Sequence, residues 1–231
     1  MKPQGLPAVI AATSLLSAGV AQAELVNWYL PGDTPYLSTD DSPWVGTSAD
    51  MEYFYLEDFE DGLLNTPGLD ASIGVVRAPW TATDSVDADD GVIDGFGREG
   101  YSFWRYEPDV APSITFTFEL DVLGLLPTNV GLVWTDGNDA ALVTFEVFDA
   151  DGLSLGSFQT MLGDGYHSGG TAADRFLGAE YALGISAMTI SAEFGGLEVD
   201  HIHYGASVVP APSAAVAVLL GLGIRRGRRR R

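Results

Sequence analysis

An aspartate-rich stretch between residues 84 and 94 holds the densest group of potential metal ligands in the chain. The carboxylates belong to Asp84, Asp87, Asp89, Asp90 and Asp94. Calcium binds six to eight oxygens, and clustered carboxylates in a glycine-turned loop supply them. The stretch differs from an EF-hand loop, because the glycine is one place out of register with Asp87 and Asp89 and no glutamate closes the loop. We expect either a structural calcium site, completed by distant carboxylates such as Glu57, Asp58 or Asp200, or aspartates that cap turns through their own backbone.

A second motif, G-x-S-x-G from Gly152 to Gly156, matches the nucleophile elbow of serine hydrolases. That chemistry requires a strand, a strained turn and then a helix, so that the serine meets an oxyanion hole. Here Ser154 follows a hairpin turn and leads into another predicted strand. We therefore predict no catalytic residues, and a secreted hydrolase is the least favoured function.

Two of the three histidines, His201 and His203, stand close together in the sequence. On a strand both would point to the same face, as a pair of metal ligands does. No third ligand accompanies them at a useful spacing, so a strand with one polar face explains them equally well.

Other residues suit the binding of a sugar. Aromatic rings offer flat apolar surfaces, and a few polar groups fix the orientation of a ligand. The candidates are Trp80, Trp104, Asp164, His167 and Arg175. For Arg175 the alternative is a salt bridge that fixes its glycine-rich loop, whereas Trp134 continues an apolar strand and is expected in the core.

The scaffold for these residues is predicted from alternation of apolar and polar side chains. Residues 113–122 show it most clearly, with Ile114, Phe116 and Phe118 on one face. The same period of two recurs over residues 129–135, 141–148, 154–161, 185–194 and 197–204. Turn residues such as Asp149–Gly152 separate these segments. We predict an all-β fold, an antiparallel β-sandwich of jelly-roll type over residues 51–205, after an irregular lead-in over residues 24–50 that packs along it.

Charge is distributed unevenly along the chain. The formal net charge is −21, from 32 acidic and 11 basic residues. All 32 acids lie between Glu24 and Asp200, where only four arginines occur, so this body carries −28. Such a field repels nucleic acid and anionic membrane surfaces, and we exclude nucleic acid as a partner. The absence of cysteine excludes disulfides and thiolate sites.

The N-terminal 23 residues have the pattern of a secretory signal peptide. Lys2 supplies a positive charge, an apolar stretch follows, and Ala21-Gln22-Ala23 forms a small-x-small cleavage site. We expect cleavage after Ala23 and export through the secretion machinery.

The last residues, 206–231, combine three features in order: the segment Val209, Pro210, Ala211, Pro212, an apolar run over residues 214–224, and an arginine cluster. The arginines are Arg225, Arg226, Arg228, Arg229, Arg230 and Arg231. About 20 apolar residues are needed to span a bilayer, so the run is marginal as a permanent anchor, and the arginines would stay in the cytoplasm.

This three-part tail resembles a PEP-CTERM sorting tail, with Ala211 in place of the middle glutamate. The resemblance implies recognition by an exosortase-like membrane protease, processing near the Pro-x-Pro motif and a link to exopolysaccharide. It also implies transient anchoring in the inner membrane, followed by a place at the cell surface, in the outer envelope or in the extracellular matrix. An ordinary tail anchor is the alternative.

The body resembles a domain found in many PEP-CTERM proteins and similar to lectin-like jelly rolls. The resemblance rests on phrases such as YLEDFEDGLLNTPG (Tyr55–Gly68), LPTNVGLVWTDG (Leu126–Gly137) and DHIHYG (Asp200–Gly205). It brings no catalytic residues with it. We expect a non-catalytic envelope or matrix protein. The alternative is a carbohydrate-binding module, with or without dependence on calcium.

Overall fold

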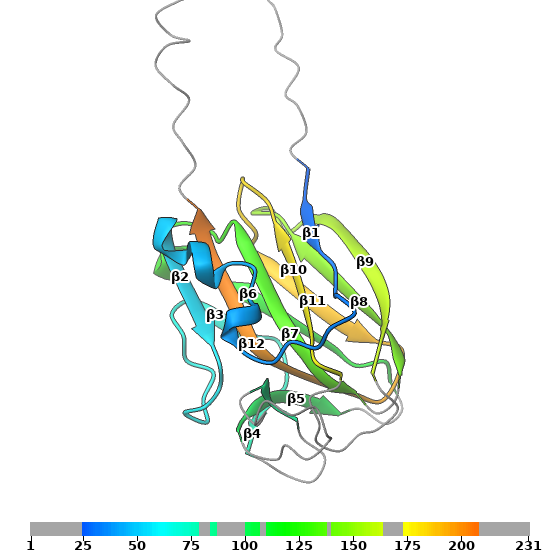
Figure 1. The fold of residues 1–231 in the computed structure, drawn as a ribbon. Coiled ribbons are helices and arrows are strands. Elements are labelled where there is room, and N and C mark those ends of the chain that lie inside the picture. The colour runs from blue at the N-terminus through cyan, green and yellow to red at the C-terminus, as the bar shows by residue number, and fades with distance from the viewer. Residues whose placement is uncertain are drawn as a thin grey trace, which may run out of the picture.

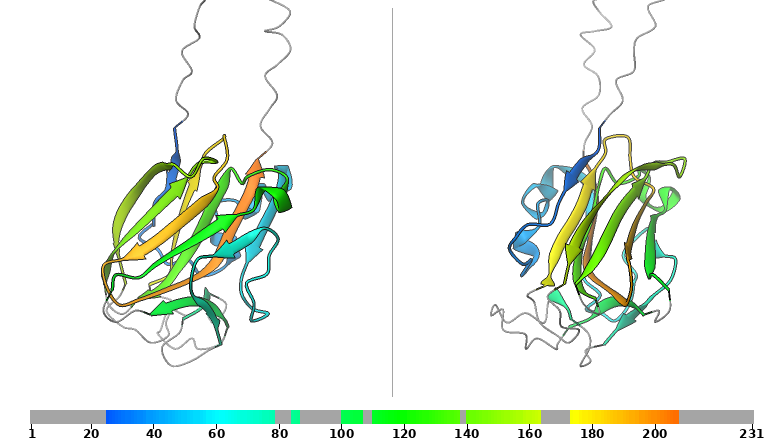
Figure 2. Two further views of the ribbon diagram at one scale, coloured as in Figure 1. Left: turned by 180° about the vertical axis from the view of Figure 1, so that it is seen from behind. Right: turned by 90° about the vertical axis from the view of Figure 1, so that its right-hand side faces the viewer.

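A computed structural model of the chain describes residues 25–78, 84–86, 100–106, 110–137, 140–163 and 173–207. These residues form two antiparallel sheets packed face to face (Figures 1 and 2). The signal peptide predicted over residues 1–23, with Ala21 and Ala23, lies outside the described residues. So do Val209, Pro210, Ala211, Pro212 and the C-terminal arginines.

Sheet A has seven strands. The order across it is β1 (Asn27–Tyr29), β10 (Arg175–Glu180), β7 (Asn129–Gly137), β12 (Gly196–Ser207), β5 (Ser102–Tyr106) and β4 (Val75–Arg77). The seventh strand, β2 (Met51–Glu57), pairs with the second half of β12, beyond the half that pairs with β5. One side of β12 therefore has two successive neighbours.

Sheet B has five strands. Their order is β3 (Leu69–Ala71), β6 (Ser113–Phe118), β11 (Ala187–Ala192), β8 (Ala141–Phe148) and β9 (Ser154–Leu162). From β5 onward the chain fills the two sheets in the orders β10-β7-β12-β5 and β6-β11-β8-β9, which is the arrangement of a jelly roll. The predicted fold class, an antiparallel β-sandwich of jelly-roll type, is confirmed.

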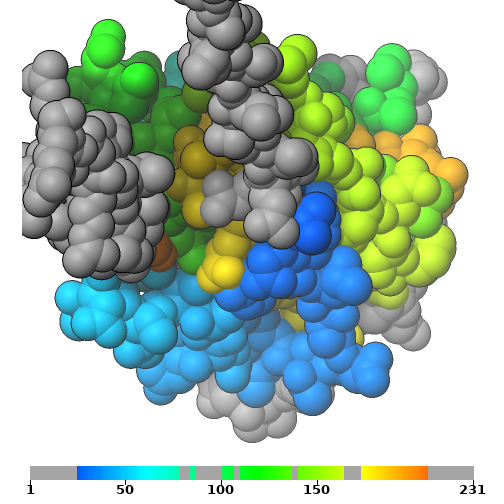
Figure 3. All heavy atoms as spheres, turned by 90° about the horizontal axis from the view of Figure 1, so that it is seen from above, coloured from blue at the N-terminus to red at the C-terminus, as the bar shows by residue number. Residues whose placement is uncertain are grey.

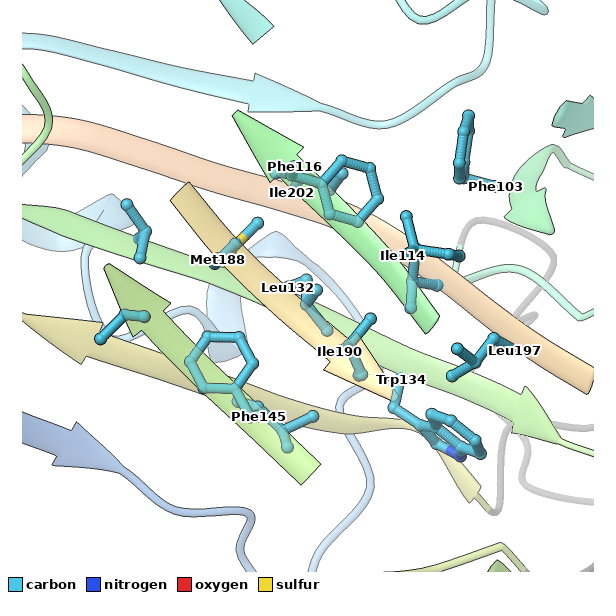
Figure 4. Packing of buried hydrophobic residues seen from close by; sticks show 14 of the residues in the cluster. Phe103, Ile114, Phe116, Leu132, Trp134, Phe145, Met188, Ile190, Leu197 and Ile202 are labelled. Atoms are coloured by element: carbon cyan, nitrogen blue, oxygen red, sulfur yellow. The ribbon is translucent and has the colours of Figure 1, made fainter. Parts of the chain in front are cut away.

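The core lies between the sheets (Figure 4). In β8, Ala141, Val143, Phe145 and Val147 are buried and the residues between them are half-buried, because successive side chains on a strand point to opposite faces. Trp134 on β7 is fully buried, as predicted.

Several observed strands end at other residues than predicted. The strand predicted over residues 113–122 ends at Phe118, and Leu120–Leu123 form a single helical turn, α1, that stops at Gly124 in the left-handed conformation (φ 77°). The strand predicted over residues 185–194 is shorter, because Phe194 lies in the turn before β12 and is 45% exposed. The sandwich was predicted to end at residue 205, but its last strand, β12, continues to Ser207.

The lead-in is part of the sandwich. It contributes β1 and then two short 3-10 helices, η1 (Thr39–Asp41) and η2 (Val45–Asp50), which lie on the outer face of sheet A. Viewed from above, this blue segment packs against the yellow strand β10 (Figure 3). The first and last described residues, Leu25 and Ser207, lie at the same end of the sandwich (Figure 1). Within the described part of the chain, no helix has the length and apolar character needed to cross a membrane.

Candidate functional site

The outer face of sheet A is divided into a covered half and an end that carries aromatic and acidic side chains. The covered half lies under the lead-in. There the Trp44 indole contacts Phe176 and His203 and donates from Nε1 to Glu180 Oε1 at 3.0 Å. The same carboxylate oxygen accepts from the Tyr29 hydroxyl at 2.6 Å and from Asn129 at 2.8 Å. Glu180 therefore fastens the lead-in to the sheet.

The two histidines lie under this cover. His203 is fully buried, and both ring nitrogens have protein partners, the Ser42 hydroxyl at 2.8 Å and the Tyr36 hydroxyl at 3.3 Å. Burial, and to a smaller extent the neighbouring His201, lowers the pKa of His203 to about 3. His201 is also buried, at a positive φ of 41° where β12 bulges. Because both ring nitrogens of His203 already have hydrogen-bond partners in the protein, a strand with one polar face explains the two histidines better than a pair of metal ligands does.

At the other end of the sheet, β5 presents alternate side chains to the outer face. Phe103 points into the core, so Ser102, Trp104 and Tyr106 point away from it. Trp104 lies opposite Glu198 on β12 and opposite Val75 on β4. The register thus places an aromatic pair beside the start of β12, at the end opposite the two described chain ends.

Trp104 and Tyr106 form a stacked pair. Their ring centroids lie 5.9 Å apart and the planes differ by 11°. The Arg77 guanidinium carbon lies 4.5 Å from the centroid of the Trp104 ring, a cation–π contact. Across from Tyr106 stands Gly196, and a Cβ there would come within 4 Å of both rings. Tyr106 is 47% exposed and Trp104 is half-buried, so the pair offers an accessible aromatic surface.

A buried acidic cluster adjoins this pair. Glu198 is 2% exposed and accepts a hydrogen bond from the Ser102 hydroxyl. Burial raises the pKa of Glu198 well above its usual value; the Ser102 hydroxyl lowers it, and Asp136 and Asp84 raise it again through their charge. Burial therefore favours the neutral form of Glu198 over the charged one, and a neutral carboxyl can donate as well as accept hydrogen bonds.

The carboxylates named as possible calcium ligands have other partners where they are described. Asp200 accepts from the Ser85 hydroxyl at 3.0 Å and from Val86 N at 2.9 Å, and Asp84 accepts from Ser85 N at 3.0 Å. Glu57 accepts from the backbone nitrogens of Phe59, Asn65 and Thr66. Among the described residues no three histidine, aspartate or glutamate side chains are placed to hold a metal. Asp87, Asp89, Asp90 and Asp94 lie outside those residues, and calcium stays a prediction.

The predicted sugar-binding residues are only partly described. Trp80, Asp164 and His167 lie outside the described residues. Arg175 donates to the carbonyl oxygens of Asp174 at 2.7 Å and Asp33 at 3.4 Å, so it fixes the start of β10 to the lead-in. Of the five candidates, Trp104 is the one placed on an accessible aromatic surface. Sequence reasoning missed Tyr106 and Arg77, although the spacing of two between Trp104 and Tyr106 on a strand was a usable signal.

Ser154 of the G-x-S-x-G segment opens strand β9 directly after the turn at Gly152 (φ 73°) and donates to Glu146 at 2.5 Å. The strand, turn and helix of a nucleophile elbow do not occur at this place.

Comparisons with known proteins gave no matching family model and no matching curated protein. Several solved structures are similar to the chain, among them the following three. The first is the enzymatically active domain of bacteriophage CBA120 tailspike protein 4 (13% identity, TM-score 0.35, 64% of this chain and 20% of that one). The second is TmCBM61 in complex with β-1,4-galactotriose (13%, 0.33, 65% and 91%). The third belongs to the carbohydrate-binding modules of the β-sandwich superfamily (17%, 0.31, 64% and 60%). The chain spans one fifth of the tailspike domain.

Proposed function

We propose that this chain is an exported, non-catalytic envelope or matrix protein whose sandwich binds a neutral polysaccharide at the end of sheet A that carries Trp104 and Tyr106. The observation that carries the proposal is the stacked, accessible pair beside the Arg77 guanidinium and the buried Glu198. A flat apolar surface bordered by a few polar groups suits a sugar ring, which has apolar C–H faces and hydroxyl edges.

The charge of the body narrows the ligand class. With a net charge of −21 for the chain, an acidic polysaccharide or a nucleic acid would be repelled unless a cation bridged the two. A neutral exopolysaccharide carries no such penalty. The proposed partner is therefore a neutral glycan, with calcium as a possible cofactor of the aspartate-rich loop.

The placement of the two ends supports an exported, tethered protein. Strand β12 begins beside the aromatic pair and ends at Ser207, where the C-terminal tail follows. The pair and the start of the tail are therefore about 30 Å apart at 3.3 Å per residue. If the tail holds the chain at a membrane, the pair points away from it, toward material outside the cell. In the proposal, the N-terminal signal directs export and an exosortase-like protease then processes the tail near Pro210 and Pro212.

Pull-down on insoluble or immobilised polysaccharides, neutral and acidic, with and without EDTA, tests the binding. We expect saturable binding to a neutral glycan and a loss of at least about ten-fold in affinity, about 1.4 kcal/mol, in Trp104→Ala and Tyr106→Ala. Tyr106→Phe keeps the ring and is expected to bind. Leu125→Ala, which removes an exposed apolar side chain at the other end of the sandwich, is the control. Unchanged binding in both alanine variants would refute this surface as the site.

Intact-mass measurement of the protein released from the cell surface tests the sorting. A C-terminus near Pro212 supports processing, whereas retention of Arg225 through Arg231 would show an ordinary anchor.

A further inference from the structure

Strand β9 forms a long open edge of sheet B. It is the outermost strand, and it pairs with β8 alone (Figure 1). At the other sheet edges, β1, β3 and β4 have three residues each. The only other long edge strand in the described part of the chain is β2, with seven residues, and it carries Glu52 and Glu57. β9 has nine residues.

Over most of its length this edge lacks the features that usually prevent strands of separate molecules from pairing. Natural edge strands are kept short, are bulged, or carry lysine, inward-facing charges or proline. Of these features β9 has only a bulge at its start, between Ser154 and Gly156, where Gly156 has a φ of 124°. From Gly152 to Gly163 the sequence GLSLGSFQTMLG contains no charged residue and no proline. The chain has 32 acidic residues, yet this uncharged segment coincides with β9, the one nine-residue edge strand of the described residues.

The side chains along this edge leave it accessible. Ser157, Gln159 and Met161 are exposed on the outer face, while Phe158 packs toward the core. The nearest acid in the pairing register is Glu146 on β8, opposite Ser157, and it accepts the Ser154 hydroxyl at 2.5 Å. Nothing charged therefore projects from β9 itself.

We propose that β9 is a self-association edge, at which the β9 strands of two copies pair antiparallel and join two five-stranded sheets into one. Two identical strands related by a two-fold axis present matching N–H and C=O groups to each other. The lack of charge selects this occupant. A cationic partner would be attracted anywhere on the acidic body. A second copy is equally acidic, so it approaches best where neither chain carries charge. A paired matrix protein would hold two sandwiches side by side.

Overlap of the two strands centred on Phe158, with the bulge near the end of the overlap, fixes distances that can be measured. The axis passes by Phe158, so the Cα atoms of the two Gln159 residues lie about 8 Å apart, from a strand spacing of about 4.8 Å and a rise of about 3.4 Å per residue. Thr117 on β6 lies three strands inside sheet B. The same geometry separates its two copies by about 40 Å.

Spin labels on single cysteines test this in the full chain, which has no cysteine of its own. We expect labels at Gln159→Cys to show a spin–spin distance below about 20 Å and labels at Thr117→Cys to show a distance near 40 Å. The amplitude of both dipolar signals should grow with protein concentration. Sedimentation of the same samples reports how much dimer is present.

A variant that adds negative charge to β9 gives a second test of the proposal. The variant with Ser157→Glu and Gln159→Glu places like charges across the axis, and we expect the dissociation constant to rise at least about ten-fold. The matched control, Ser113→Glu with Thr117→Glu, adds the same charge to β6 on the same sheet face and is expected to associate as the wild type does. The proposal is overturned if the chain stays monomeric, if dimers form without the short Gln159 distance, or if removing residues 208–231 alone abolishes association.

Discussion

Trp44 and Gly178 fit together because residue 178 has no side chain. A Cβ on Gly178 would lie 2.8 Å from Trp44 Cη2, 2.9 Å from Phe176 and 3.1 Å from the Val130 carbonyl oxygen. The indole therefore lies directly on the backbone of β10. This contact brings the lead-in down onto the sheet and closes the cover over His203.

Replacing Gly178 should loosen that cover. We expect Gly178→Ala to lower the free energy of unfolding by about 1–3 kcal/mol, because the added methyl pushes against a packed ring and a carbonyl oxygen. Urea unfolding followed by circular dichroism measures the change. Gly46→Ala, in the same lead-in, has open space around its Cβ and should be close to neutral. Equal losses in the two variants would contradict the contact.

Burial of neutral His203 should make stability depend on pH. The pKa is about 3 in the fold, against 6.5 for a free histidine, so the unfolded chain takes up a proton first as the pH falls. The contribution of this residue is complete above pH 6.5 and is lost toward pH 3, by up to about 1.4 kcal/mol per pH unit.

His203→Gln keeps polar atoms between Ser42 and Tyr36 but does not titrate. Unfolding free energies measured from pH 7 to pH 4 should therefore fall less steeply in this variant than in the wild type. Parallel curves would show that folding does not change the pKa of His203.

Glu198 should act in the opposite direction. Because its pKa is raised in the fold above the ordinary value of 4.5, the folded state holds a proton that the unfolded state releases. Its contribution is complete below pH 4.5 and is lost as the pH rises. Glu198→Gln keeps an acceptor for Ser102, so we expect it to be more stable than the wild type at pH 7 and similar near pH 4. A less stable variant at pH 7 would indicate that a bound cation compensates the ionised carboxylate.

Calcium binding by the aspartate-rich loop predicts a difference in melting temperature. At a calcium concentration of about 100 times Kd, binding adds about 2.7 kcal/mol, which raises the Tm of a domain of this size by about 5–10 °C relative to EDTA. Substitution of Asp87, Asp89, Asp90 and Asp94 by asparagine should remove the difference. Asparagine at Asp121 and Asp151, both exposed on other turns, is the control. Identical melting curves in calcium and EDTA would exclude the site.

The strands could be predicted because their pattern is local. Over residues 141–148 every second residue is apolar, and the structure has β8 at those bounds. The prediction failed where a polar-apolar alternation ran past the end of a strand, as at Leu120, which is 50% exposed in the turn α1. Alternation in a short segment does not distinguish the end of a strand from a turn that exposes its apolar residues.

The candidate surface could be predicted only in part. Trp104 was recognisable as an aromatic residue near turns, but its partners come from β4 and β12, and β12 is more than 90 residues further along the chain. Which rings remain accessible depends on what covers them. Trp44, another tryptophan in a turn-rich segment, is 2% exposed because it packs between the rest of the lead-in and β10.

The sequence by itself determined the period of two, the turn residues, the uneven charge and the pattern of the two ends, because these are properties of neighbouring residues. Only the tertiary structure decided that Trp104 and Tyr106 stay accessible beside a buried Glu198, that His203 is enclosed by Ser42 and Tyr36, and that β9 is left as an uncharged edge. Each of these depends on the pairing of strands distant in sequence, and that pairing is set by the packing of the whole core.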